Sequence, residues 1–238
     1  MINLIGWLFG ASVYVAMLGV VLSLSTASAL QKWITFIVAL GWGALIIAVG
    51  TLGGFAPGAA GPVPGPGLAL VGLMALLFGG WFLVPQFRAA LLSVPLPALV
   101  ALNVGRIGGI MFIVLAANGR LSAPFAPSAG WGDVITGVAA IPLALMARRD
   151  LARVATPLAL WNAFGILDLV VAVSLGMLSA PGTPFRVFTD EPGTTAMGQL
   201  PWVMIPSILV PIYLLIHLTI ATKLRSIRRP AAAAATTA

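Results

Sequence analysis

Apolar residues dominate seven long stretches of the chain, and short polar or Pro/Gly-rich segments separate them. A helix that crosses a bilayer needs about 20 mostly apolar residues, and each stretch is close to that length. The pattern therefore predicts an all-α fold, a membrane helical bundle with seven transmembrane helices. The predicted spans are residues 2–24, 33–55, 68–84, 97–118, 131–147, 157–178 and 201–223.

Residue types at the ends of the apolar runs predict two helix starts. Thr156 and Pro157 predict one of them, with Thr as the N-cap and Pro in the first turn. Gly132 and Asp133 predict the other, because an acidic residue suits the positive end of the helix dipole. This interpretation places Asp133 at the outer edge of the membrane.

The pattern indicates a single polytopic transmembrane domain over residues 1–229. Residues 230–238 form an Ala-rich, low-complexity tail, which we predict to be disordered. The run STASA at residues 25–29 resembles a signal-peptide cleavage site. Because the residues before it include no Lys or Arg, we expect the first helix to be retained.

The composition excludes a soluble domain and several kinds of site. Of the residues, 61% are hydrophobic and 7% are charged, whereas soluble domains carry about 25% charged residues. The absence of cysteine excludes disulfides, thiolate metal sites and a Cys nucleophile. The single histidine, His217, excludes bis-His haem ligation and zinc sites built on several histidines. We therefore predict that the lipid bilayer surrounds the protein and that the protein binds no metal and no cofactor.

The net charge of +7, taken alone, would suggest a protein that binds nucleic acid, but the positions of the basic residues exclude that partner. They lie beside the apolar spans, where they orient helices in the membrane. Nine fall in one set of alternating loops and two in the other, so we predict a cytoplasmic C-terminus and an external N-terminus in a bacterial cytoplasmic (inner) membrane. The nine are Lys32, Arg88, Arg148, Arg149, Arg153, Lys223, Arg225, Arg228 and Arg229, and the two are Arg120 and Arg186.

Arg106 lies inside the fourth apolar run, where a charged side chain needs a partner. A guanidinium at the centre of a membrane costs roughly 2.5–3.5 kcal/mol on insertion scales. Asp168 falls near the middle of the sixth predicted span, at a similar depth, so we predict a charge pair between them. Further polar side chains are expected just below this level, namely Asn103, Asn162, Tyr213 and His217. We expect Asn103 or Asn162 to complete the hydrogen bonds of the charge pair.

Two interpretations of this polar layer are open. In the first, it is a structural ion pair that locks helices together; Gly105 and Gly109, four residues apart, suit a close-packed helix face. In the second, it lines a cavity that binds a small polar or anionic solute or relays protons, because ionisable groups inside membranes are usually functional. The second predicts a small-solute or proton-coupled transporter or binding protein. The first suits a non-catalytic subunit or assembly factor with membrane-protein partners.

Residues 130–133 spell Gly-x-Gly-Asp, and residues 97–99 spell Pro-Ala-Leu. Both resemble motifs of intramembrane aspartyl proteases, the presenilin and prepilin-peptidase group. This resemblance implies two carboxylates that share a proton, with Asp168 as the partner of Asp133. The order of the motifs differs from that family, and the predicted depths place the two carboxylates far apart. We therefore predict no catalytic residues and hold the protease as a distant alternative.

The second half of the chain also resembles a family of uncharacterised bacterial polytopic membrane proteins, over roughly residues 103–225. This resemblance implies a multi-pass membrane protein and no particular activity. The residues that carry it are Arg106, Gly109, Phe125, Ala126, Ala129, Gly130, Gly132, Asp133, Trp161, Asn162, Gly165, Asp168, Leu169, Ile205, Pro206, Val210, Pro211 and His217.

Overall fold

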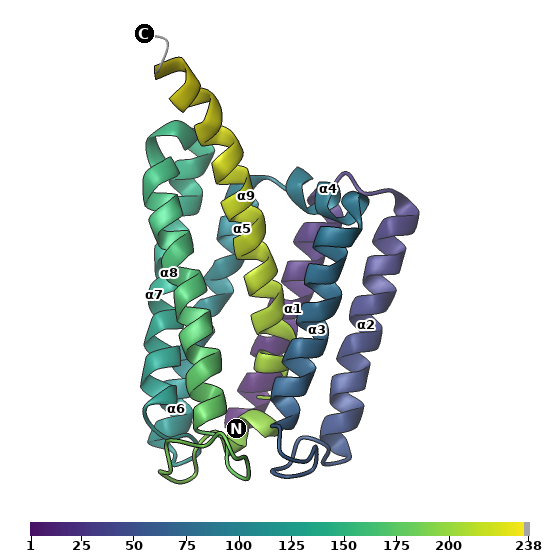
Figure 1. Cartoon of the computed structure of the whole chain (residues 1–238), viewed down its shortest axis with the longest axis vertical. Helices are drawn as coiled ribbons and strands as arrows, with labels where there is room; N and C mark the ends of the chain where they lie inside the picture. The colour runs from purple at the N-terminus through teal and green to yellow at the C-terminus, as the bar shows by residue number, and fades with distance from the viewer. Residues whose placement is uncertain (236–238) are drawn as a thin grey trace.

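The apolar runs form the helices of an all-α bundle in the computed structural model of the chain, which describes residues 1–235. Seven helical segments are long and apolar enough to cross a membrane (Figure 1), as the hydropathy pattern predicts. They are α1 (Ile2–Leu24), α2 (Ala29–Thr51), α3 (Gly65–Leu83), α5–η1–α6 (Leu96–Leu102, Asn103–Gly109 and Ile110–Ala117), α7 (Phe125–Arg149), α8 (Leu151–Leu178) and η3–α9 (Ile205–Leu209 and Val210–Ala235).

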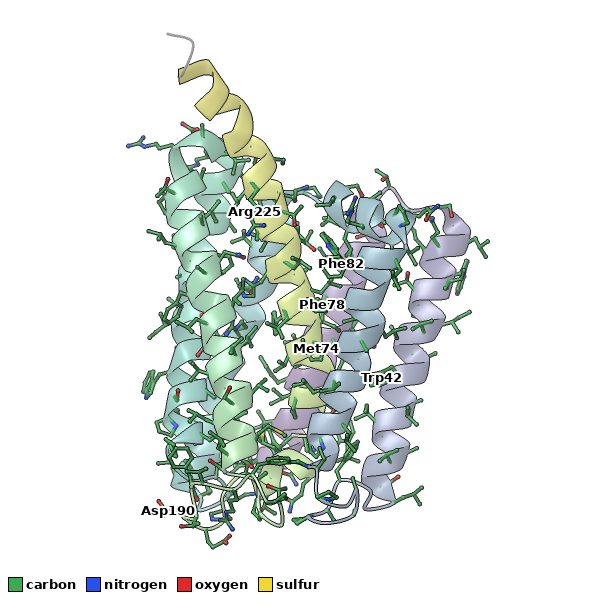
Figure 2. The ribbon with its side chains drawn as sticks, in the orientation of Figure 1. Trp42, Met74, Phe78, Phe82, Asp190 and Arg225 are labelled. Carbon is green, nitrogen blue, oxygen red and sulfur yellow. The ribbon has the colours of Figure 1, made fainter. Side chains whose placement is uncertain are left out.

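The chain runs back and forth between two ends of the bundle. The N-terminus and the long connections 52–64 and 179–204 lie at one end, which we call the loop end; α9 extends from the other, which we call the C-terminal end (Figure 1). Asp190 lies at the loop end, whereas Arg225 lies toward the C-terminal end (Figure 2). The N-terminus and the far end of α9 are thus at opposite ends of the bundle, as seven spans require. Which end faces the cytoplasm stays a prediction from the basic residues.

Two predicted helix starts are wrong. Helix α8 begins at Leu151 rather than at Thr156, because the Asp150 side chain accepts a hydrogen bond from the Arg153 backbone N–H at 3.1 Å and caps the helix there. Helix α7 begins at Phe125, so Asp133 lies two turns inside it instead of at its start.

Two short elements complete the described part of the chain outside the spans. Helix α4 (Pro85–Ser93) joins α3 to α5 at the C-terminal end, and η2 (Thr195–Gly198) lies in the last connection at the loop end (Figure 1). The bounds of α9 include part of the Ala-rich tail, and residues 236–238 lie outside the described residues. The predicted disorder of residues 230–238 therefore stays a prediction.

Helix α7 is at the centre of one group of closely packed helices, because it contacts α5, η1, α6 and α8. The core around it includes Leu99, Val100 and Leu158, which are fully buried. Helix α2 differs, because Gly43 and Ile46 are its buried residues and most of its apolar side chains point away from the bundle. Such outward apolar surface suits lipid contact.

The fourth span changes from α-helix to 3-10 helix over η1, in the Gly-rich sequence around Arg106. A 3-10 helix has 3.0 residues per turn, so residues four apart do not share a face. Gly105 accordingly packs against Tyr213 and Val13, while Gly109 packs against α7 at Gly130. The predicted single Gly105–Gly109 face is thus split between two sides of the segment, and both glycines allow close approach.

A π-helical turn, η3, opens the last span where Pro206 and Pro211 occur. Pro211 has no N–H, so the carbonyl of Ser207 lacks its usual helical donor. The indole N–H of Trp42 donates to that carbonyl at 3.0 Å. This bond joins α2 to the last span and satisfies the carbonyl within the apolar region.

Candidate functional site

Arg106 lies at the centre of the polar side chains inside the bundle, on η1. It is 2% exposed, and its Nη2 donates to Asp168 Oδ2 from α8. The predicted charge pair is therefore confirmed. Burial in the bundle interior makes this pairing necessary, because either charge alone would be uncompensated.

A second carboxylate, which the sequence did not predict here, binds the same guanidinium. Arg106 Nε donates to Asp133 Oδ1 from α7 at 2.7 Å. The expectation that Asp133 sits at the membrane edge, far from Asp168, is wrong. The physical reason is that α7 already begins at Phe125. Asp133 comes eight residues later in the helix, which places it roughly 12 Å further into the bundle than the helix start.

The third nitrogen of the guanidinium binds a carbonyl and an imidazole. Arg106 Nη1 donates to the Gly165 carbonyl at 3.2 Å and lies 3.1 Å from His217 Nε2. A guanidinium has no acceptor, so Nε2 accepts and the His217 proton is on Nδ1. That proton is donated to Asn162 Oδ1 at 2.8 Å. His217 is thus a neutral, hydrogen-bonded packing residue that orients Arg106.

The remaining predicted residues surround the cluster less directly. The Tyr213 ring lies 5.8 Å from Arg106 Cζ, within range of a cation–π contact, and its buried hydroxyl has no hydrogen-bond partner in the described structure. Asn103 donates to the Leu99 carbonyl at 3.2 Å, and its buried Oδ1 has no partner there either. The expectation that Asn103 or Asn162 completes the bonds of the charge pair is therefore wrong: Asn162 acts through His217.

Glycines make room for the cluster. A Cβ at Gly132 would overlap the carboxylate of Asp168, and one at Gly109 would overlap Asp133. A Cβ at Gly165 would press on His217 and Arg106. The Gly-x-Gly-Asp sequence thus has a packing role, because it lets α8 bring its carboxylate beside α7.

Two cavities border the cluster. The larger, which we call the loop-end cavity, has a volume of about 280 Å³ and lies between α3, α8 and η3 beneath the connections of the loop end. The smaller, of about 30 Å³, lies between Arg106, Asp133 and Tyr213 and is large enough for one water molecule. Asp133 lines both cavities, and its side chain is 17% exposed against 7% for Asp168.

The charges of the cluster do not balance. Arg106 contributes one positive charge, Asp133 and Asp168 contribute two negative charges when ionised, and His217 is neutral. An uncompensated negative charge inside the bundle is costly, so one more positive charge is needed, such as a proton or a bound cation. Groups of His, Cys, Asp or Glu that would suit a metal ion are absent from the described residues.

Comparison with known proteins identifies one family. Residues 63–225 match the model of a family described as a domain of unknown function (DUF8737). The match includes the whole cluster and extends upstream of the region in which the sequence suggested a family resemblance. No curated protein sequence and no solved structure matches the chain.

Proposed function

The chain belongs to the family described as a domain of unknown function (DUF8737), a description that names no activity. From the site geometry we propose that this multi-pass membrane protein is a proton-exchanging solute-binding protein or transporter. One observation carries the proposal: two buried carboxylates share one guanidinium. The proton and the solute would meet at Asp133, the carboxylate that lines the cavities.

The sharing of Arg106 favours proton exchange. Nε and Nη2 are neighbouring donors of the planar guanidinium, and this fork commonly binds both oxygens of a single carboxylate. Here the two donors bind different carboxylates, from α7 and α8. Two carboxylates held at one site repel each other, and uptake of one proton relieves that repulsion. The cluster is thus built to hold one exchangeable proton.

Because Arg106 already has acceptors, the cluster suits a cationic solute better than an anionic one. The guanidinium already donates to two carboxylates and the Gly165 carbonyl and contacts His217. An anionic solute would have to replace one of these acceptors and would add to the excess negative charge. A proton and a cationic solute would instead compete for Asp133, and this competition would couple proton release to solute binding.

The test is an infrared titration of the protein in lipid vesicles. We expect a protonated-carboxyl band that disappears as pH rises and is missing in Asp133→Asn. Asp190→Asn is the matched control, because Asp190 lies in the connection at the loop end (Figure 2), and it should keep the band. Carboxyls of the cluster that stay ionised at every pH at which the protein is folded would show a purely structural network, of the kind expected for a non-catalytic subunit of a membrane complex.

The convergence of Asp133 and Asp168 also favours the aspartyl protease alternative. That chemistry needs two carboxylates that share a proton and activate a water molecule. Arg106 instead binds one oxygen of each carboxylate, and Asp168 is nearly inaccessible. We rank the protease below solute binding for this reason. Cleavage of a transmembrane peptide that Asp133→Asn abolishes would reverse that order.

A further inference from the structure

The loop-end cavity has the form of a ligand site rather than of a packing defect. Its volume of about 280 Å³ is just below the range of drug-sized small-molecule sites, roughly 300–1,000 Å³, so it suits a small ligand. Its walls come from segments far apart in sequence, including Phe55, Leu68, Phe125, Ala172 and Met177. An apolar body of small-molecule size would fit against these side chains.

Charge enters this cavity at a single place. Asp133 is the one charged residue among those that line it, and the other polar side chains there are Thr183, Thr194 and Thr195 near the loop end. The cavity therefore has an apolar body and a carboxylate at its inner end. A ligand that matches it carries its positive charge at one end of an apolar body.

The described cavity wall also reaches the surface of the bundle. Leu68 and Val71 line the cavity from α3 and are 49% and 62% exposed. On α8, Gly176 lines the opposite side. An apolar molecule dissolved in the membrane could therefore reach the cavity along α3, without crossing the polar connections.

We propose that the loop-end cavity binds an apolar amine, with its protonated nitrogen at Asp133 and its apolar body between α3 and α8. This inference rests on the proposed function and names the class of solute. The ammonium group supplies the positive charge that the cluster lacks, so it replaces the exchangeable proton. Binding and protonation of Asp133 are then mutually exclusive.

The test compares two probes of the same shape. A tritiated phenylalkylamine and the alcohol of the same carbon skeleton are titrated onto the full-length protein in lipid nanodiscs. We expect the amine to bind at least about tenfold more tightly than the alcohol. As pH is lowered through the range in which Asp133 takes up a proton, the affinity for the amine should fall by up to about tenfold per pH unit. Equal binding of the two probes, or no binding of the amine, would overturn the inference.

Two variants locate the site. Asp133→Asn should remove the preference for the amine over the alcohol. Gly176→Leu should remove binding of both probes, because a Cβ at Gly176 meets only ordinary contacts and the added side chain would occupy space in the cavity that the probes need. Gly41→Leu on α2 is its matched control, since a Cβ at Gly41 meets no atom within 4 Å, and it should bind both probes as the wild type does. Amine binding that either site variant leaves unchanged would place the amine elsewhere and overturn the inference.

The infrared titration separates the two proposals. A protonated-carboxyl band that depends on Asp133, together with no amine binding, would overturn this inference and leave the proposed proton exchange standing. Absence of the band, together with amine binding that depends on Asp133, would overturn proton exchange and leave Asp133 as a cation site. Absence of both would overturn both proposals.

Discussion

Asp133 Oδ1 accepts a hydrogen bond from Arg106 Nε at 2.7 Å, which joins α7, two turns after its start, to the 3-10 segment η1. This bond changes the energetics expected of the buried charge pair. With Asp168 alone as partner, removal of both members would leave no orphan charge. With Asp133 present, removal of Arg106 and Asp168 together still leaves one buried carboxylate.

Arg106→Ala should therefore be the most damaging single change in the cluster. It strands two carboxylates, and loss of one partner from a buried pair costs about 3–5 kcal/mol in unfolding free energy. Arg106→Leu with Asp168→Leu should remain destabilising, and adding Asp133→Leu should recover stability. The measurement is denaturant unfolding in detergent micelles.

Arg120→Ala is the control for the Arg106 series. Arg120 donates to Asn3 and Gln199 in an exposed setting at the loop end, where the loss should stay below about 1 kcal/mol. Equal stabilities of the Arg106 and Arg120 variants would contradict the buried network.

Gly132→Ala should disturb the cluster without changing any charge. The added methyl would occupy the position of the Asp168 carboxylate, so the carboxylate must move or the helices must separate. Overpacking of this kind costs about 1–3 kcal/mol. Thermal unfolding checks this, with Gly41→Ala as the control, because a Cβ at Gly41 meets no atom within 4 Å. A Gly132→Ala variant as stable as Gly41→Ala would show that Asp168 is not held against α7.

Trp42→Phe should cost about 1–3 kcal/mol, because it leaves the Ser207 carbonyl without its indole donor. Pro211→Ala supplies a backbone N–H four residues after Ser207, so the second change should restore part of the lost stability in the Trp42→Phe background. A double-mutant cycle measures this coupling. Strictly additive effects would mean that Trp42 and Pro211 do not act on the same carbonyl.

Reporter fusions test the orientation in the membrane. Fusions after Ala60, Gly119 and Asp190 should report an external position, and fusions after Ala90 and Asp150 a cytoplasmic one. The physical reason is the excess of basic residues in the connections at the C-terminal end. The reverse pattern would invert the orientation but leave the fold unchanged, because the order of the helices alone decides which connections share an end of the bundle.

Much of the architecture follows from the sequence alone. The number of spans, the all-α class and the opposite positions of the termini depend on the lengths of apolar runs, which are local properties. The need of Arg106 for Asp168 also follows, because a charge inside a membrane demands a partner at its own depth. Asp168 was identifiable because it is the one charged residue in the predicted span 157–178.

The tertiary structure decided which further groups meet Arg106. The sequence signal at Asp133, a Gly turn before an acid, also suits a helix start, and only the observed start of α7 at Phe125 sets its depth. Asn103 and Arg106 are three residues apart in η1, where a 3-10 helix keeps them on one face, but Asn103 donates back to the Leu99 carbonyl and makes no bond to the cluster. The loop-end cavity lies between α3, α8 and η3, which are distant in sequence. No local sequence pattern predicts such a cavity, because its volume depends on how side chains from several packed helices fit together.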